Sequence, residues 1–275
     1  MSGILYLVPT PIGNLGDISH RCAETLAAAD FIAAEDTRVS LKLLNHLDIK
    51  KPLVSYHEHN KKESGSRILE RLLTGETCAL VTDAGCPAIS DPGEDLVRLC
   101  AEAGVSVCAI PGPCAAITAL SVSALATGRF AFEGFLPFSK KERRERLERL
   151  KAEERTMIFY EAPHRLRDTL AELLSAFGPE RPVSLCRELT KLHEEILRMT
   201  LDEAVAFYAA NEPRGEYVLV VAGAERAVEA VSLEQAVALV QALIANGTRT
   251  KDAVKQIAEE TGVAKNALYA AVVSG

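Results

Sequence analysis

The chain has 275 residues, of which 48% are apolar and 25% charged, and its formal net charge is -7. These values are typical of a globular protein with one large domain or two ordinary ones. The acidic balance argues against a nucleic-acid partner bound by bulk charge alone, and no apolar run approaches the ~20 residues of a membrane span.

The first part of the chain alternates short apolar runs with helical patterns. The runs predict strands at residues 4–8, 31–34, 53–55, 78–81 and 105–110. The patterns between them predict helices at residues 19–29, 61–73, 93–103 and 114–125, with Ser19 as the first N-cap. Strands that alternate with helices pair in parallel, so we expect an α/β domain over residues 1–126.

A second block follows an irregular segment at residues 126–134. Its predicted helices are 139–154, 164–177 and 201–210, and its predicted strands are 156–160, 182–186, 195–199 and 216–221. This pattern indicates a second α/β domain over residues 127–228, with some hairpin character. The tail, residues 229–275, shows only helical patterns, at 233–245, 250–260 and 264–272, with helix-turn-helix spacing.

Seven cysteines occur, and none of them forms a C-x-x-C pair, so neither a zinc site nor a disulfide framework is indicated. His57 and His59 are the one pair that suggests a metal, but no second ligand cluster accompanies them, and we expect no metal. The thiols favour a reducing compartment, and the N-terminus lacks the pattern of a signal peptide. We therefore expect a cytoplasmic protein.

Three turns rich in Gly and Pro follow predicted strands of the first domain, at residues 9–17, 82–93 and 111–115. In open α/β sheets, ligands bind at the carboxyl ends of the strands. Glycine lets the backbone approach a ligand, and a carboxylate such as Asp83 accepts hydrogen bonds from a sugar diol or an amino group. No G-x-G-x-x-G or P-loop pattern occurs, which disfavours a polyphosphate ligand. Each turn alone could be an ordinary loop, but three together predict one cleft for a nucleoside-like ligand.

Eight segments in order resemble one family: VPTPIGNLGDIS, AAEDTR, TDAGCPAISDPG, PGPCAAITAL, FEGFLP, FYEAPHR, RELTKLHEE and GEYVLVVAG. The chain is similar, from about residue 4 to 223, to the bacterial ribosomal RNA small-subunit methyltransferase I family of the tetrapyrrole-methylase superfamily. The resemblance implies two α/β domains with S-adenosylmethionine (SAM) in the cleft between them, and a homodimer. It also implies methylation of a cytidine 2′-hydroxyl in the decoding region of 16S rRNA, within the small ribosomal subunit.

The resemblance also implies which residues bind the cofactor. The turn after residue 81 would cradle SAM, with Pro9 at the floor of the cleft. The implied cofactor-binding residues are Pro9, Asp83, Ala84, Gly85, Pro87, Ile89, Cys114, Ala115, Tyr160 and Ala222. Of these, Tyr160 and Ala222 would approach from the second domain.

Methyl transfer to a ribose hydroxyl benefits from a base or from a cation that stabilises the developing alkoxide. Our candidates are Lys191, Glu188 and His164. Lys191 comes first, because a lysine whose pKa is lowered by burial can act as a base. The alternative is that these charged groups form ion pairs, and that His164 simply opens the next helix.

The segment 139–155 holds eight basic and five acidic residues. It is either a solvated helix with internal ion pairs or a rim on which Lys140, Lys141, Arg143 and Arg144 bind RNA phosphates. The helical tail could add phosphate contacts. Two other functions stay open: methylation of a porphyrin-like ring within the same superfamily, and a non-catalytic regulator that reads duplex DNA through its tail.

Overall fold

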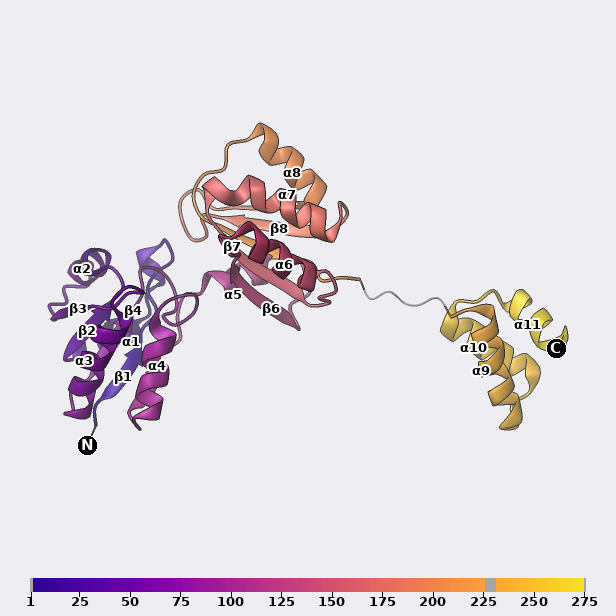
Figure 1. Ribbon diagram of the computed structural model, residues 1–275, viewed down its shortest axis with the longest axis horizontal. Coiled ribbons are helices and arrows are strands. Elements are labelled where there is room, and N and C mark those ends of the chain that lie inside the picture. Colours follow the sequence, from indigo (N-terminus) through magenta and orange to yellow (C-terminus); the bar gives the residue numbers. More distant parts are fainter. Residues whose placement is uncertain (1, 226–230, 275) are drawn as a thin grey trace. The chain divides into compact units, whose positions relative to one another are not determined.

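The computed structural model describes residues 2–225 and 231–274, and it divides into two compact units, Met1–Ala224 and Glu225–Gly275 (Figure 1). The first unit contains two five-stranded sheets with their helices. The second contains only helices. The predicted boundary at residue 228/229 lies outside the described residues, and the one at 126/127 falls between helix α5 (Ala115–Val122) and strand β6 (Phe130–Phe135).

The first sheet is entirely parallel, as the alternating pattern predicts. Its strands lie in the order β3 (Leu53–Ser55), β2 (Phe31–Ala34), β4 (Cys78–Val81), β1 (Ile4–Leu7) and β5 (Ser106–Ala109). Successive side chains of a strand point to opposite faces. Phe31 and Ala33 therefore join one core, and Ile32 and Ala34 join the other.

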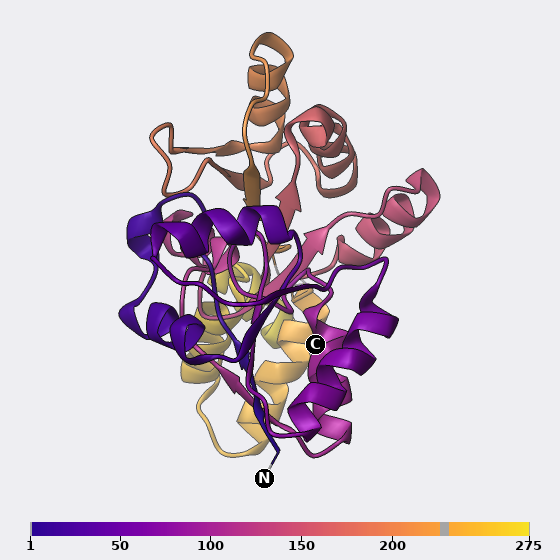
Figure 2. The same cartoon turned by 90° about the vertical axis from the view of Figure 1, so that its left-hand side faces the viewer.

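Helices cover both faces of this sheet, so the first part of the unit has three layers (Figure 2). Helices α3 (Lys61–Leu73) and α4 (Gly93–Glu102) pack on the face of Phe31. Helices α1 (His20–Ala28) and α2 (Thr37–His46) pack on the face of Ile32. The Ser19 hydroxyl accepts the N–H of Cys22, which confirms the predicted N-cap. Helix α2, capped by Asp36, was not predicted.

The second sheet is mixed. Its order is β6 (Phe130–Phe135), β7 (Thr156–Glu161), β10 (Tyr217–Val221), β8 (Pro182–Arg187) and β9 (Glu195–Thr200). Only β6 and β7 are parallel, and β8 and β9 form the expected hairpin. Strand β6 was also not predicted, because a bulge between Phe132 and Gly134 interrupts its alternation. Helices α6 (Lys140–Leu150), α7 (Leu166–Phe177) and α8 (Leu201–Ala210) cover one face of this sheet.

Helix α5 (Ala115–Val122) covers the other face of the second sheet, although it follows β5 of the first sheet in the chain. Its buried residues Ala116, Ala119 and Leu120 pack against Ile158, Val218 and Val220. The turn before α5 belongs to the first sheet. This helix therefore fixes the carboxyl ends of the first sheet's strands next to the second sheet.

The second unit has its own small core. Helices α9 (Leu233–Ala245), α10 (Thr250–Thr261) and α11 (Lys265–Ser274) bury a shared set of apolar side chains. Gly262 ends α10 in a left-handed conformation, with φ of 73°. Among the described residues, no helix is long and apolar enough to cross a membrane.

Candidate active site

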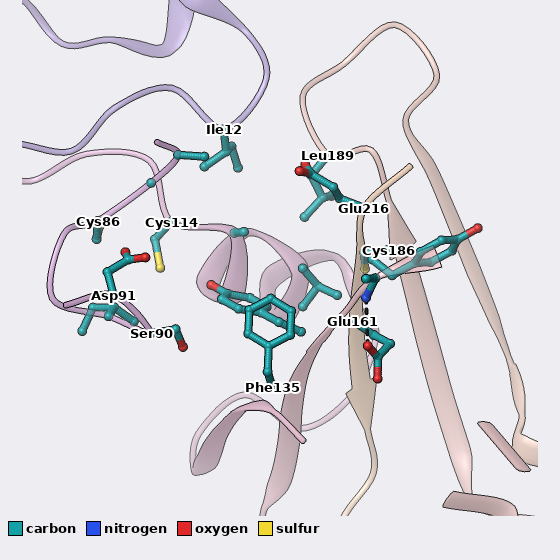
Figure 3. A pocket seen from close by; sticks show the side chains of 18 of the residues that line it. Ile12, Cys86, Ser90, Asp91, Cys114, Phe135, Glu161, Cys186, Leu189 and Glu216 are labelled. Atoms are coloured by element: carbon teal, nitrogen blue, oxygen red, sulfur yellow. Dashed lines mark hydrogen bonds between the residues drawn. The ribbon is translucent and has the colours of Figure 1, made fainter. Parts of the chain in front are cut away.

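A cavity of about 430 Å³ lies where both sheets of the first unit present the ends of their strands. That volume falls within the range of ordinary small-molecule sites. The first sheet contributes Ile12, Ala84, Gly85, Cys86, Ile89, Ser90, Asp91, Cys114 and Ala115. The second contributes Phe135, Tyr160, Glu161, Ala162, Pro163, Cys186, Leu189, Glu216, Tyr217 and Val218. Figure 3 shows Cys86, Cys114 and Asp91 on one side of the cavity, and Phe135, Glu161 and Cys186 on the other.

The three predicted turns meet at this cavity. Thr10 and Gly85 exchange two backbone hydrogen bonds, of 2.9 and 3.1 Å, which join the first turn to the second. The Cys86 thiol donates to the Pro113 carbonyl at 3.2 Å, which joins the second turn to the third. Ala88 and Ser90 both have positive φ, 69° and 65°. Such strain is typical of ligand-binding loops held by their surroundings.

Carboxylates gather on the turns after β2 and β4, and of these Asp91 lines the cavity. The Thr82 hydroxyl donates to Glu35 at 2.7 Å, and the Asp36 N–H donates to Asp83 at 3.1 Å. Burial raises the pKa of Asp91 to about 6, and the nearby negative charge of Glu35 adds to the effect. Burial also raises the pKa of Asp83. A cation in the cavity would stabilise the charged form of Asp91, which lines it.

Two thiols face each other at the start of α5. Cys114 is the N-cap residue of that helix. A hydrogen bond with the Cys86 thiol lowers the pKa of Cys114, despite burial, and the N–H groups of Ile117 and Ala116 help. The same hydrogen bond, together with burial, raises the pKa of Cys86. Cys114 is therefore the more acidic thiol, with its negative form stabilised by the helix start.

An aromatic wall forms the side that belongs to the second sheet. The Tyr160 hydroxyl accepts the N–H of Ala116 at 3.2 Å, and burial raises the pKa of Tyr160 to about 12. The rings of Phe132 and Phe135 meet Tyr160 edge-on, with centroids 5.2 and 5.5 Å away. Phe135 still exposes 51% of its surface. An exposed aromatic ring at a cavity offers a stacking surface to a planar ligand.

Lys191 lies at the rim, between two carboxylates. Its Nζ donates to Glu188 at 2.9 Å and to Glu216 at 2.7 Å, and Glu216 lines the cavity. A Cβ at Gly13 would lie only 2.4 Å from Lys191 Cγ, so this glycine lets the lysine stem cross the first turn. Burial alone would lower the pKa of Lys191, but the two carboxylates outweigh it and the pKa is raised. The lowered pKa that a base would need is therefore not found, and the ion-pair alternative describes how Lys191 and Glu188 lie.

The other predicted residues are placed as follows. Ala84, Gly85, Ile89, Cys114, Ala115 and Tyr160 line the cavity. Pro9, Asp83 and Pro87 lie in the same turns but not on the cavity surface. His164 is exposed, directly after the lining residue Pro163. Glu188 does not line the cavity. Its carboxylate accepts hydrogen bonds from Lys191 Nζ and from the backbone N–H of Glu216, each at 2.9 Å, and Glu216 lines the cavity.

Ala222 does not reach this cavity. Strand β10 is antiparallel to β7, and its register pairs Tyr217 with Glu161 at the cavity and Val221 with Met157 at the far end. Ala222 follows Val221 and bonds to the Pro182 carbonyl at 2.9 Å. The start of the GEYVLVVAG segment therefore lines the cavity, and its end points away.

Arg143 also differs from the prediction. Its side chain is buried and pairs with Glu172 through its Nη2, at 2.7 Å, so it is not available to a phosphate.

The prediction did not single out three residues that line the cavity, Asp91, Phe135 and Glu216, although each belongs to a quoted motif. Among residues 2–225 and 231–274, no three His, Cys, Asp or Glu side chains are grouped to hold a metal.

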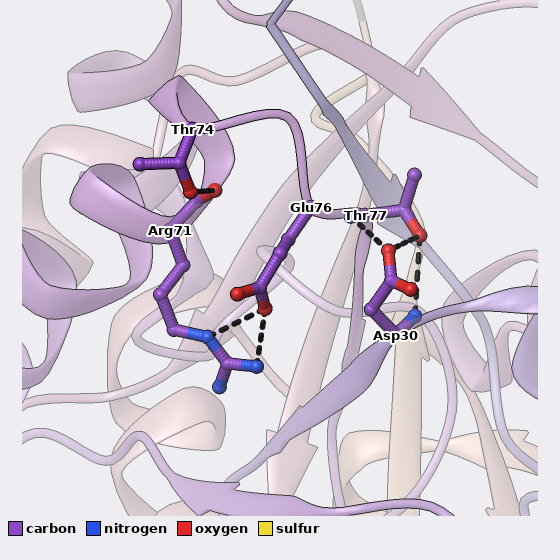
Figure 4. A network of polar contacts seen from close by, with 5 residues as sticks. All are labelled: Asp30, Arg71, Thr74, Glu76 and Thr77. Carbon is purple, nitrogen blue, oxygen red and sulfur yellow. Dashed lines mark hydrogen bonds and ion pairs between the residues drawn. The ribbon is translucent and has the colours of Figure 1, made fainter.

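A second polar cluster lies at the opposite end of the first sheet's strands (Figure 4). Asp30 accepts the backbone N–H and the hydroxyl of Thr77, both at 2.7 Å, and these bonds lower the pKa of Asp30. Arg71 binds Glu76 and stacks 3.5 Å over the Phe31 ring. These residues precede β2 and β4 and close the amino ends of the strands. We assign them a structural role.

The chain matches the family model described as "Tetrapyrrole (Corrin/Porphyrin) Methylases" over residues 4–205. A relative from Halalkalibacterium halodurans, "Ribosomal RNA small subunit methyltransferase I", is 52% identical over 97% of this chain and 93% of its own. The protein of that name from Synechocystis is 49% identical, over 97% and 96%.

A solved structure with a similar fold is uroporphyrin-III C-methyl transferase from Thermus thermophilus, complexed with S-adenyl homocysteine. It has a TM-score of 0.57 and 19% identity, and the match covers 79% of this chain and 97% of the other. At this identity the likeness shows the fold alone. It confirms the predicted α/β class. By its model match and its close relatives, the chain belongs to the tetrapyrrole (corrin/porphyrin) methylase family and groups there with the proteins named ribosomal RNA small subunit methyltransferase I.

Proposed function

We propose that this protein is a SAM-dependent methyltransferase that modifies the 16S rRNA of the small ribosomal subunit. The observation that carries the proposal is the cavity at the strand ends, with acidic groups on one side and aromatic rings on the other. The relatives that are about half identical over nearly the whole chain supply the substrate class.

The cavity residues fit SAM by their chemistry. The cofactor has a positively charged sulfonium and amino group, and Asp91 offers a partly buried carboxylate that is ionised above its pKa of about 6. Phe135 and Tyr160 offer an apolar face for a planar base. Gly85 and the backbone of the turn around it allow close approach. When bound, the sulfonium supplies an activated methyl group.

The implied cofactor residues stay part of this proposal, from Pro9 to Tyr160 along the three turns and the aromatic wall. For Ala222 the geometry argues against a place in this cavity. We also propose, from the resemblance, a homodimer that acts in the cytoplasm. Light scattering on the purified protein tests the dimer.

For the acceptor we propose a cytidine 2′-hydroxyl in the decoding region. Lys191 is a cation at neutral pH, because two carboxylates raise its pKa. We propose that its ammonium stabilises the negative charge that develops on the 2′-oxygen, rather than acting as a free base. Glu188 is then a positioning residue, since it holds Lys191 and the N–H of Glu216. His164 remains a candidate proton acceptor at the rim.

The test is methyl transfer from labelled SAM to small ribosomal subunits that lack the modification. Parallel reactions contain naked 16S rRNA and uroporphyrinogen III. We expect label on the ribose of one decoding-region cytidine. Label in the tetrapyrrole but not in RNA would contradict the proposed substrate and leave the fold assignment intact.

Lys191→Ala should lower kcat about 100-fold or more, the scale of a lost catalytic group, while SAM affinity changes little. Lys191→Arg keeps the charge and should recover part of the rate. Lys62→Ala, an exposed lysine on α3, is the matched control. Equal rates for Lys191→Ala and the control would remove Lys191 from the mechanism.

A further inference from the structure

The loop between β6 and α6 carries an aromatic residue, Phe138, whose ring is largely exposed to solvent. Phe138 exposes 85% of its surface, and among the described residues only Leu192 exposes a larger fraction of a large apolar side chain. The Arg165 guanidinium lies 4.6 Å from the centroid of the Phe138 ring. Arg165 is itself fixed, since it donates to the Leu136 carbonyl at 2.9 Å and lies 3.6 Å from Glu161. The ring is thus held in place while most of it stays in contact with water.

Unpaired basic side chains follow immediately on α6. Lys140 and Arg144 are exposed, and no ion pair within the described part of the chain involves either of them. They are four residues apart on a helix, so they share one face. Lys141 is also exposed, with Glu145 at 4.0 Å, while Arg143 turns inward. The start of α6 adds partial positive charge to this face.

Arg165 links this surface to the cavity, since it contacts Phe138 and lies 3.6 Å from the lining residue Glu161. Phe135, three residues before Phe138, lines the cavity and is half exposed. Glu161 and Pro163, which precede Arg165, line it as well. Exposed aromatic and basic groups therefore follow the lining residue Phe135 closely along the chain, at Phe138, Lys140 and Arg144.

We infer that residues 135–144 bind the single-stranded RNA that adjoins the target nucleotide. Phe138 stacks on a base next to the methylated one, and Lys140 and Arg144 bind the phosphates that follow. Aromatic platforms interleaved with basic groups are the means by which proteins hold single-stranded nucleic acid, and the charges are complementary to a phosphate chain. An acidic protein can bind RNA in this way because the contact is local. The inference rests on the proposed rRNA substrate.

The test measures binding of the full-length protein to a fluorescein-labelled single-stranded RNA 12-mer that spans the target region, by anisotropy at several salt concentrations. Phe138→Ala should weaken binding about 5- to 50-fold, the loss expected for one base stack. Phe138→Trp should retain affinity. Lys140→Gln with Arg144→Gln should lower the slope of log K against log salt by about 0.7 per lost contact.

Arg149→Gln is the matched control, because Arg149 is exposed on the same helix but two turns away from Lys140. SAM affinity, measured by calorimetry, should be the same in all variants. If Phe138→Ala and the double variant bind RNA like the control while wild type methylates rRNA, this inference is overturned and the proposed function stands. If wild type neither binds nor methylates RNA, the proposed function itself is contradicted, and this inference falls with it.

Discussion

At the scale of single residues, Asp91 brings a carboxyl into the cavity where burial raises its pKa to about 6. None of the residues that line the cavity is a lysine or an arginine, so the charged form of Asp91 meets no cation of the protein at the cavity surface. Lys191, whose partner Glu216 lines the cavity, is already paired with Glu188 and Glu216. Asp91 is therefore the group whose charge a bound cation would change most.

We expect SAM to bind about tenfold more tightly at pH 7 than at pH 5, because Asp91 loses its proton across that interval. Asp91→Asn should bind more weakly at pH 7 and show little change between the two pH values. Calorimetric titration of both proteins measures this, with Glu94→Gln, an exposed carboxyl on α4, as control. The same pH dependence in Asp91→Asn as in wild type would assign it to another group.

The raised pKa of Asp91 also makes the stability of the ligand-free protein depend on pH. An acid whose folded pKa is raised from 3.8 to about 6 stabilises the fold only while it is protonated. That contribution is lost as pH rises from about 4 to 6 and stays absent above. Because Asp91 is partly exposed, Asp91→Asn should gain only on the order of 1 kcal/mol at pH 8 in urea unfolding.

At the scale of elements, β7 connects the core of the second sheet to the cavity. Phe159 is fully buried among residues of α7 and the neighbouring strands, and Tyr160, the next residue, lines the cavity from the other face. Because successive side chains of a strand point to opposite faces, β7 contributes both to the core and to the cavity wall. Helix α5 plays a similar part, since its start supports Cys114 and its body packs on the second sheet.

Phe159→Ala should lower the free energy of unfolding by about 3–5 kcal/mol, because it leaves a large cavity in a packed core. Phe138→Ala removes the same ring from an exposed position and should change stability by less than about 0.5 kcal/mol. Urea denaturation of the two variants compares them directly. A similar loss in both would mean that Phe138 packs in solution, against the exposure seen here.

At the scale of the whole molecule, every residue that lines the cavity lies in the unit Met1–Ala224. The helical unit has a separate core built from Ala236, Val240, Ala253, Val254, Ile257 and Leu268. Its basic residues Arg249, Lys251, Lys255 and Lys265 are exposed.

A chain that ends at Ala224 should therefore fold and bind SAM with an affinity within about twofold of the full-length value, since no lining residue is removed. Circular dichroism and calorimetry check both. Its affinity for small ribosomal subunits should fall, because the removed exposed cations can bind phosphates. Loss of SAM binding in a folded truncated protein would show that the helical unit supports the cavity.

Local sequence determined much of this protein. The strands Phe31–Ala34 and Cys78–Val81 and the helix Lys61–Leu73 match their predicted bounds, because apolar periodicity, caps and turn residues act within a few positions. The three turns that build one side of the cavity were predicted for the same reason. Helix α2 was missed although Asp36 caps it, and the bulged strand β6 was missed because it loses its alternation at Gly134.

Only the tertiary structure decided which residues face the cavity from the second sheet. The antiparallel direction of β10 puts Val218 at the cavity and Ala222 at the far end, and strand direction is set by pairing with distant segments. Lys191 meets Glu216 across 25 residues of sequence, which reverses the expected direction of its pKa shift. Arg143 turns inward because Glu172 on α7 lies beside it. Burial and charge pairing depend on neighbours that only the folded chain brings together, so these features could not follow from local pattern.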